Sequence, residues 1–309
     1  MKVLGIGNAI VDVLCKVDDE FLNKNSLIKS TMKLIDEKEF KNLISELKVE
    51  KTISGGSVAN TIVGLSQLGN DVGFIGKVKD DDLGKKYEDG LIKENVNFLY
   101  SKKNEPIPTG TCLILITPDS ERTMCTFLGI AGKVSDEDVS AIKIKKSKIT
   151  LLEGYLWDEG EPKKAFNKAI NNANKVAMSL SDLFCVERHK LQFLEMVKNK
   201  LDVTLCNEQE ITSLTDAKNF SDVISFCKSI NRLIVVTRGE KGSMAIYKND
   251  IFECPSKQDL DIKDLTGAGD LFAAGFLHGY INDLPLQDSL KLGTDMSSKI
   301  IQKIGARLN

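Results

Sequence analysis

Apolar runs of strand length alternate with amphipathic helical stretches from Thr150 onward, and this alternation limits the chain to one broad class of fold. The expected strands cover residues 150–156, 175–180, 202–206 and 233–237, and the expected helices cover 162–174, 187–198 and 220–229. Such alternation is typical of an α/β protein with a mostly parallel sheet and helices on both faces. Hydrophobic residues at 42% and charged residues at 28% of the 309 indicate an ordinary globular protein.

The first hundred residues continue the same pattern. A strand is expected at 3–6, and Asp36 with Glu39 resembles the N-cap pair of a helix. An apolar stripe from Val58 to Leu68 predicts another helix, which Gly69 closes at its C′ position. A strand at 72–78 and a helix at 83–93 follow.

Two segments, 12–35 and 110–128, contain short extended runs with no expected helix between them. Residues 111–117 and 122–127 flank a Pro-Asp-Ser-Glu turn and predict a β-hairpin. We expect one α/β domain over 1–309, with a small β-sheet lid inserted from approximately 12–35 and 107–128. The alternative is an extra hairpin at the edge of the main sheet.

Charge and composition narrow the classes of partner. The formal net charge of -2 gives no reason to expect nucleic acid or an anionic membrane, and no apolar run approaches the roughly 18 residues of a membrane span. The seven cysteines form no CxxC pair and no signal peptide is evident, which predicts a cytoplasmic protein. His189 and His278 are far apart in sequence and offer no metal-ligand spacing.

The stretch from Asp264 to Asp270 reads Asp-Leu-Thr-Gly-Ala-Gly-Asp and opens a helical pattern. Unpaired N–H groups at a helix start bind anions, and Gly267 and Gly269 allow an oxygen close to the backbone. Asp270 beside such a site could take a proton from an attacking hydroxyl. The alternative is a carboxylate that only favours the helix dipole.

Familiar nucleotide motifs are absent from the sequence. Gly5-Ile6-Gly7 follows a strand, but Ile10 stands where a dinucleotide fingerprint needs its third glycine, and no helix follows. No GxxxxGK[ST] string occurs. A nucleotide would therefore need another binding device.

Two groups of residues near the first strands are candidates for binding the molecule whose hydroxyl would accept a phosphoryl group. Asn8 and Asp12 follow the first strand, and a carboxylate such as Asp12 accepts two hydrogen bonds from a pair of sugar hydroxyls. Gly55 and Gly56 open a helix in which Asn60 can both donate and accept. The alternatives are a turn with a surface aspartate and a flexible loop with a polar cap.

The residues at two further strand ends are candidates for binding the molecule that donates the phosphoryl group. Asn207 and Glu210 share one face of a first helical turn and could order waters around Mg²⁺, or could simply cap the helix. Thr237, Gly239 and Gly242 end another strand in a glycine loop that suits a nucleotide phosphate or ribose. The alternative for this loop is a plain hairpin turn.

Taken together, these motifs resemble the PfkB (ribokinase-like) family of carbohydrate and nucleoside kinases over essentially the whole chain. The residues from Gly55 to Asn60, the Asn207-x-x-Glu210 spacing and the run from Asp264 to Asp270 stand in the family's order. The resemblance implies a Rossmann-like core with a β-sheet lid. It also implies transfer of the ATP γ-phosphoryl group to a hydroxymethyl group, with Mg²⁺.

The resemblance also assigns roles. It makes Asp270 the base and places an anion hole at the amides of Gly267, Ala268 and Gly269. Asn207 and Glu210 would organise magnesium and phosphates, and the acceptor hydroxyls would be held by Asp12, Gly56 and Asn60. A monovalent cation, K⁺, is a further expectation at Asp264 and Thr266, although Leu265 stands where the family usually has threonine.

The finer resemblance is to the adenosine-kinase-like branch. It places Arg122 of the hairpin at the transferring phosphate, for which a guanidinium is well suited; the alternative is a solvated arginine. Ile10, Met124 and Phe127 could line an apolar slot for a purine. The expected acceptor is a nucleoside, adenosine first, bound by a monomer or homodimer; the alternatives are a ribokinase- or fructokinase-like sugar kinase and a non-catalytic sensor.

Overall fold

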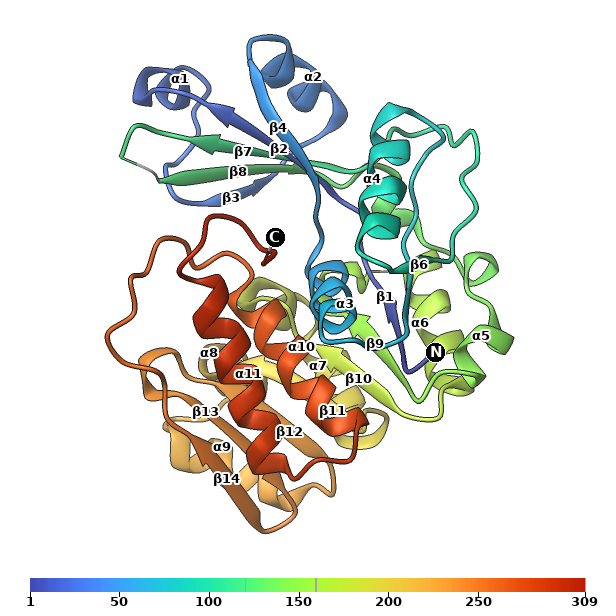
Figure 1. Ribbon diagram of the computed structural model, residues 1–309, viewed down its shortest axis with the longest axis vertical. Coiled ribbons are helices and arrows are strands. Elements are labelled where there is room, and N and C mark those ends of the chain that lie inside the picture. The colour runs from blue at the N-terminus through green and yellow to red at the C-terminus, as the bar shows by residue number, and fades with distance from the viewer. Residues whose placement is uncertain (120, 159, 309) are drawn as a thin grey trace.

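The computed structural model describes residues 1–119, 121–158 and 160–308, which form two sheets (Figure 1). The main sheet has nine strands in the order β14-β13-β12-β11-β10-β9-β1-β5-β6. Its pairs are parallel from β6 to β12, and β13 and β14 are antiparallel. The strands are β1 (Val3–Ile6), β5 (Val72–Ile75), β6 (Asn97–Phe98), β9 (Ile149–Glu153), β10 (Val176–Ser179), β11 (Val203–Asn207), β12 (Leu233–Thr237), β13 (Ser243–Tyr247) and β14 (Asp250–Cys254). The predicted mostly parallel sheet is confirmed.

Helices cover both faces of this sheet, because its strands carry apolar side chains on both faces. Neighbouring residues of β9 point in opposite directions: Leu151 packs in a core cluster with Phe272, and Leu152 packs in another with Phe166. The helices around the main sheet are α3 (Ser57–Gln67), α4 (Asp82–Lys93), α5 (Ala141–Lys145), α6 (Glu161–Asn172), α7 (Leu183–Asn199), α8 (Glu208–Thr215), α9 (Phe220–Ser229), α10 (Ala268–Ile281) and α11 (Leu286–Ile300). Short 3-10 turns lie at Gly129–Lys133, Asp136–Asp138, Gly154–Leu156 and Gly239–Lys241.

The second sheet has five strands in the order β3-β8-β7-β2-β4 and lies above the start of α3 in the view of Figure 1. Its strands are β2 (Val11–Lys16), β3 (Met32–Leu34), β4 (Val49–Ser54), β7 (Thr111–Ile116) and β8 (Arg122–Phe127). The predicted hairpin is β7–β8, and it belongs to this sheet, so the alternative of an edge hairpin on the main sheet is wrong. The predicted turn at 118–121 includes Ser120, which lies outside the described residues.

The segment 12–35 differs from the expectation of a helix-free run. It contains α1 (Asp19–Lys24), whose N-cap Asp18 accepts a hydrogen bond from the Phe21 N–H, and whose Leu22 is buried. The helix forms because its cap and this single buried leucine fix a short turn against the second sheet. A second helix, α2 (Glu37–Ser45), carries the predicted capping box of Asp36 and Glu39.

Three boundaries also differ from the sequence prediction. The strand expected at 72–78 ends at Ile75, and the strand expected at 150–156 ends at Glu153, where a 3-10 turn begins. Helix α7 begins at Leu183 because Asp182 caps it. Each difference lies at the carboxyl end of a strand or the start of a helix.

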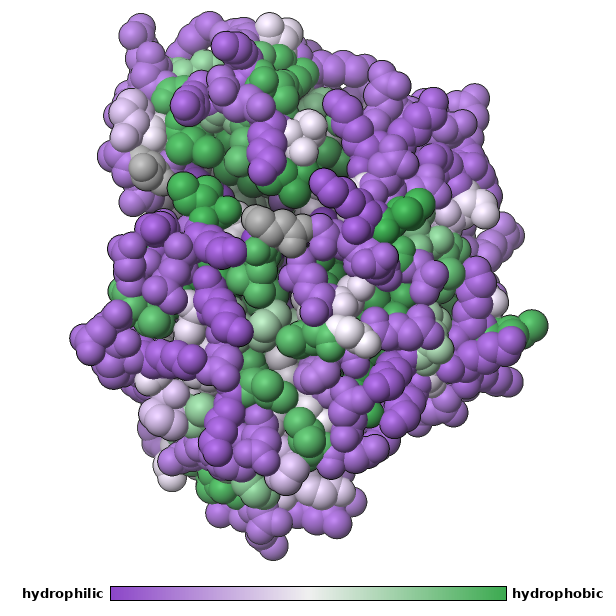
Figure 2. Space-filling model, in the orientation of Figure 1, coloured by the Kyte–Doolittle hydropathy of each residue, from purple (hydrophilic) through white to green (hydrophobic). Residues whose placement is uncertain are grey.

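Hydrophilic side chains cover most of the face seen in Figure 2, and hydrophobic ones gather over the part formed by the second sheet. No helix in the described part of the chain is both long and apolar enough to cross a membrane.

Candidate active site

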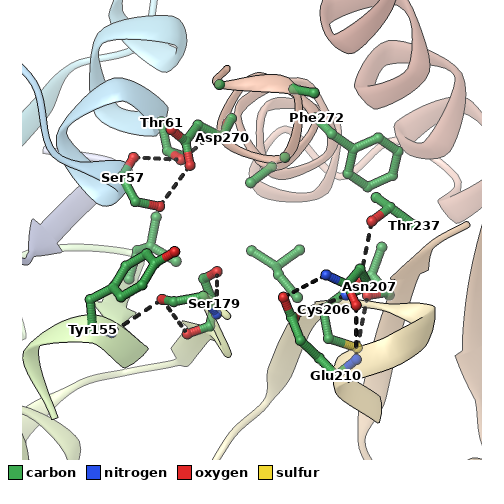
Figure 3. A pocket seen from close by; sticks show the side chains of 18 of the residues that line it. Ser57, Thr61, Tyr155, Ser179, Cys206, Asn207, Glu210, Thr237, Asp270 and Phe272 are labelled. Atoms are coloured by element: carbon green, nitrogen blue, oxygen red, sulfur yellow. Dashed lines mark hydrogen bonds between the residues drawn. The ribbon is translucent and has the colours of Figure 1, made fainter. Parts of the chain in front are cut away.

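A cavity of about 330 Å³ lies between the carboxyl ends of the central strands and the start of α10 (Figure 3). Open α/β sheets bind ligands at this edge. Helices α3, α8 and α10 and strands β9, β10, β11 and β12 contribute to its walls. The residues predicted from sequence that line it are Asn207, Glu210, Thr237, Gly267, Ala268, Gly269 and Asp270. The structure therefore brings motifs from three distant parts of the chain into one cavity.

The start of α10 offers backbone donors to this cavity. Gly267 is the N-cap and has φ +78°, and its carbonyl accepts from the Leu271 N–H. Within the described residues, the N–H groups of Gly267, Gly269 and Asp270 have no backbone acceptor, whereas Ala268 N–H donates to Leu265 O at 3.2 Å. The anion hole predicted at Gly267 to Gly269 stays a prediction, and its Ala268 amide is already engaged.

Asp270 points from the first turn of α10 toward the start of α3 (Figure 3). Ser57 Oγ donates to Asp270 Oδ1 at 2.6 Å, and Asn60 Nδ2 donates to Oδ2 at 3.0 Å. Burial raises the pKa of this carboxyl to about 6, although the two hydrogen bonds favour its charged form. A carboxylate that titrates near neutrality can take a proton from a hydroxyl.

Asp12 lies on β2 against the glycine pair that precedes α3. A Cβ atom at Gly55 would lie 2.3 Å from Asp12 Oδ2, so the absence of a side chain at position 55 makes room for the carboxylate. Gly56 is the N-cap of α3, and its carbonyl accepts from the Asn60 N–H at 2.9 Å. Burial raises the Asp12 pKa to about 7. Asp12 therefore lies in one region with the other four residues predicted for the acceptor site, which are Asn8, Gly55, Gly56 and Asn60. Their contact with a substrate stays a prediction.

Glu153 is a buried carboxylate that the sequence analysis missed. Its Oε1 accepts from the backbone N–H and the side-chain Nδ2 of Asn8 at 3.0 and 2.9 Å, and its Oε2 accepts from Val58 N–H at 2.9 Å. Burial raises its pKa to about 7. Glu153 therefore joins the loop after β1 to the start of α3. An acid at the end of an apolar strand was the sequence signal that could have found it.

Asn207 and Glu210 form the reciprocal capping box of α8. Asn207 N–H and Nδ2 donate to Glu210 Oε2 and Oε1 at 3.0 and 2.7 Å, and Glu210 N–H donates to Asn207 Oδ1 at 2.8 Å. The capping interpretation is confirmed. Glu210 is 4% exposed, burial raises its pKa to about 7, and it lines the cavity (Figure 3).

The side chains of Asn207 and Glu210 suit a Mg²⁺ ion that is held through water molecules rather than bound directly. Both Glu210 oxygens already accept from Asn207, and no cluster of three metal-binding side chains occurs in the described parts of the chain. Mg²⁺ usually keeps several of its waters, so one buried carboxylate at the cavity wall suits it. The magnesium role of Glu210 stays a prediction.

Thr237, Gly239 and Gly242 lie in the connection from β12 to β13, a hairpin that contains a 3-10 turn. The hairpin interpretation is confirmed. The same three residues line a second cavity of about 580 Å³, which shares Thr237, Ala268 and Gly269 with the first. The two cavities therefore meet at the start of α10, beside the predicted anion hole.

Arg122 of β8 reaches across to the loop before α10. Its Nη1 lies 2.9 Å from Asp264 Oδ2, and its side chain is only 14% exposed, so the alternative of a solvated arginine is wrong. Asp264 Oδ1 accepts from the Thr266 N–H and Oγ1 at 3.0 and 2.7 Å. Both Asp264 oxygens are thus engaged, and the contact of Arg122 with a phosphate and the cation site at Asp264 and Thr266 stay predictions.

One face of the second sheet carries an apolar patch, which we call the roof patch: Ile10 and Ile114, which are buried, and Leu14 and Met124, which are partly buried. Leu14 pairs with Ile114 across β2 and β7, and Ile114 pairs with Met124 across β7 and β8. Asp12 and Arg122 lie at alternate positions from Leu14 and Met124, so all four residues share this face.

The predicted apolar slot is wrong for Phe127. This residue points to the opposite face of β8, where its ring stacks on Phe40 at 5.5 Å between centroids. The reason is the two-residue period of the strand, which separates Phe127 from Met124.

Arg307 is a second residue that the sequence analysis missed. Its Nε donates to Asn60 Oδ1 at 3.1 Å, and Ala306 beside it packs on Gly267. No periodicity or motif in the sequence marks this arginine, because the segment after α11 has no regular structure of its own.

Comparison with known proteins shows similarity along most of the chain. The family described as "pfkB family carbohydrate kinase" matches residues 23–309. The crystal structure of adenosine kinase from Sinorhizobium meliloti is 36% identical, with 99% of this chain and 95% of that chain covered and a TM-score of 0.91. A probable sugar kinase from Rhizobium etli is 34% identical, with 99% and 94% covered and a TM-score of 0.90. A 5-dehydro-2-deoxygluconokinase from Listeria monocytogenes is 25% identical over 291 residues, 86% of each protein.

Proposed function

This chain belongs to the pfkB family of carbohydrate kinases, and we propose that it transfers the γ-phosphoryl group of ATP to the 5′-hydroxyl of a ribonucleoside, adenosine first. Family membership and the ribokinase-like fold confirm the resemblance drawn from the sequence and make the chain a phosphotransferase with an alcohol acceptor. The finer assignment to adenosine is supported by the similarity to the Sinorhizobium meliloti adenosine kinase.

The roof patch is the observation that carries the nucleoside assignment. Leu14, Ile114 and Met124 lie on the same sheet face as Asp12, the predicted acceptor of sugar hydroxyls. An apolar surface beside a hydroxyl-binding carboxylate fits a molecule with a flat base attached to a sugar, since burial of the base removes apolar area from water. A free sugar has no group for this surface.

The two cavities would hold different parts of the ATP molecule. The 580 Å³ cavity is large enough for the nucleoside part of ATP, and its phosphates would extend to the amides at the start of α10. Magnesium, when bound near Glu210, would neutralise phosphate charge. Asp270 would accept the proton of the acceptor hydroxyl as that oxygen bonds to the γ-phosphorus and the bond from phosphorus to ADP breaks.

A sugar kinase is the second candidate. The Listeria monocytogenes and Rhizobium etli relatives favour it, because both are described as kinases of sugars or sugar acids. In that case the roof patch would cover the acceptor as an apolar ceiling and would contact no base. Relative activity on nucleosides and sugars separates the two candidates.

The test is a coupled assay of ADP release with ATP and Mg²⁺ against adenosine, inosine, guanosine, ribose, fructose and 5-dehydro-2-deoxygluconate. We expect kcat/KM for adenosine to exceed that for each sugar at least tenfold. A higher value for any of the sugars would overturn the nucleoside assignment. Absence of ADP release with all six acceptors, together with tight ATP binding, would instead favour the non-catalytic sensor.

A further inference from the structure

The segment from Gly305 to Leu308 turns back under the second sheet and lies against the start of α10 (Figure 1). Gly305 N–H donates to Asp264 Oδ2 at 2.7 Å. A Cβ atom at Gly267 would lie 2.7 Å from Ala306 Cα, so the backbones of the two segments are in close contact. This segment is therefore held against the predicted anion hole from one side.

Arg307 extends from this segment to Asn60, which also bonds the buried carboxylate of Asp270. Its Nε donates to Asn60 Oδ1 at 3.1 Å, and the Nδ2 of the same amide donates to Asp270 Oδ2 at 3.0 Å. An unbroken hydrogen-bonded path thus runs from the guanidinium through Asn60 to the predicted base. Arg307 fixes the direction of the amide, because Nε requires its oxygen and Asp270 requires its nitrogen.

One terminal nitrogen of the Arg307 guanidinium, Nη2, is buried and has no hydrogen-bond partner among the residues that the structure describes. A buried charged donor without an acceptor is costly, so a ligand that supplies the acceptor would stabilise this arrangement. Asn60 lies one helical turn beyond Gly56, and Gly55 lies against Asp12, so the guanidinium shares the region of the predicted hydroxyl-binding carboxylate.

We propose that Arg307 is a substrate-binding residue, whose Nη2 donates to a ring hydroxyl oxygen of the acceptor while Nε holds Asn60 in position for Asp270. The proposal rests on the proposed kinase function and names one more residue of its acceptor site. A hydroxyl suits this place because it can donate its hydrogen to Asp12 and accept from Arg307 through its oxygen.

The first experiment measures binding without turnover, by titration calorimetry of adenosine and, separately, of a non-hydrolysable ATP analogue. In Arg307→Gln the Kd for adenosine should rise roughly 10- to 100-fold, the range expected for a hydrogen bond from a charged donor, and the Kd for the analogue should change less than about twofold. Arg232→Gln is the matched control, since Arg232 lies immediately before β12 and donates to Asn199 O. We expect wild-type values from it.

Tighter adenosine binding by Arg307→Gln would overturn the proposal, because it would show that the arginine occupies the acceptor site and competes with the substrate. Equal weakening of both ligands would also overturn it, since that is the result of a structural role. Arg307→Lys serves where the glutamine variant unfolds. Lysine keeps the charge but lacks the planar fork, so it should bind adenosine more weakly than the wild type while the ATP analogue binds normally.

The second experiment identifies the hydroxyl with 2′-deoxyadenosine and 3′-deoxyadenosine. One of them should bind the wild type more weakly than adenosine does, by at least the factor that Arg307→Gln costs adenosine. The affinity of this deoxynucleoside should change little when Arg307 is replaced. Losses that add fully for both deoxynucleosides would refute the contact. If a sugar proves the better acceptor in the ADP-release panel, the nucleoside assignment fails, and the titrations with that sugar decide the role of Arg307.

Discussion

Gly267→Ala tests the predicted anion hole through the backbone alone. Gly267 has φ +78°, where an alanine costs about 1–2 kcal/mol. Its new Cβ would also lie 2.7 Å from Ala306 Cα, so the segment beyond α11 must move. Loss of the Gly305 N–H bond to the Asp264 carboxylate adds about 1.5–3 kcal/mol. We expect the free energy of unfolding to fall by about 2.5–5 kcal/mol.

Gly69→Ala is the matched control for this variant. Gly69 has φ +80°, but a Cβ there meets nothing within 4 Å, so only the cost of about 1–2 kcal/mol for the backbone conformation applies. Urea unfolding of both variants therefore isolates the contact between Gly267 and Ala306.

The activity of the same pair tests the anion hole. Displaced amides at the start of α10 should lower kcat for ADP release about 100-fold in Gly267→Ala, the effect of losing one oxyanion donor, and Gly69→Ala should keep wild-type kcat. The argument is wrong if the two variants lose equal stability, or if Gly267→Ala turns over within about threefold of the wild type.

Three further predictions concern the base and the roof patch. Asp270→Asn should lower kcat by about 10²–10⁴-fold with an unchanged Kd for ATP, and unchanged turnover would reject Asp270 as the base. Because burial raises the Asp270 pKa to about 6, the base becomes protonated below that pH; a pH series of kcat/KM should fall about tenfold per unit there, and a flat profile down to pH 5 would contradict the assignment. Ile114→Asn should raise KM for adenosine at least tenfold relative to KM for ribose, and Phe127→Leu, on the opposite sheet face, should leave that ratio unchanged; equal ratios in the two variants would remove the roof patch from the acceptor site.

The sequence predicted the main sheet well because its central strands are buried on both faces and therefore stand out as apolar runs. The spacing of Asn207 and Glu210 was equally readable, since residues three apart on a first turn must face each other. β4 (Val49–Ser54) escaped prediction because it is a largely exposed edge strand with a polar sequence. Such a strand is specified by its neighbour β2 more than by its own residues.

The acceptor site was only partly predictable for a related reason. Asp12, Gly55 and Asn60 lie in motifs, but Glu153 and Arg307 are held near the predicted acceptor site by contacts over long sequence separations. Glu153 bonds Asn8 and Val58, which are 145 and 95 residues away. Arg307 bonds Asn60 over 247 residues. No local pattern encodes a partner at that distance.

The ion pair between Arg122 and Asp264 joins β8 of the second sheet to the loop before α10. An arriving phosphoryl group would be a second anion for the same guanidinium, so nucleotide and Asp264 would compete for one positive charge. Occupation by the nucleotide would then weaken the contact that holds the second sheet to the loop before α10, whereas salt would weaken it little, because both side chains are largely buried.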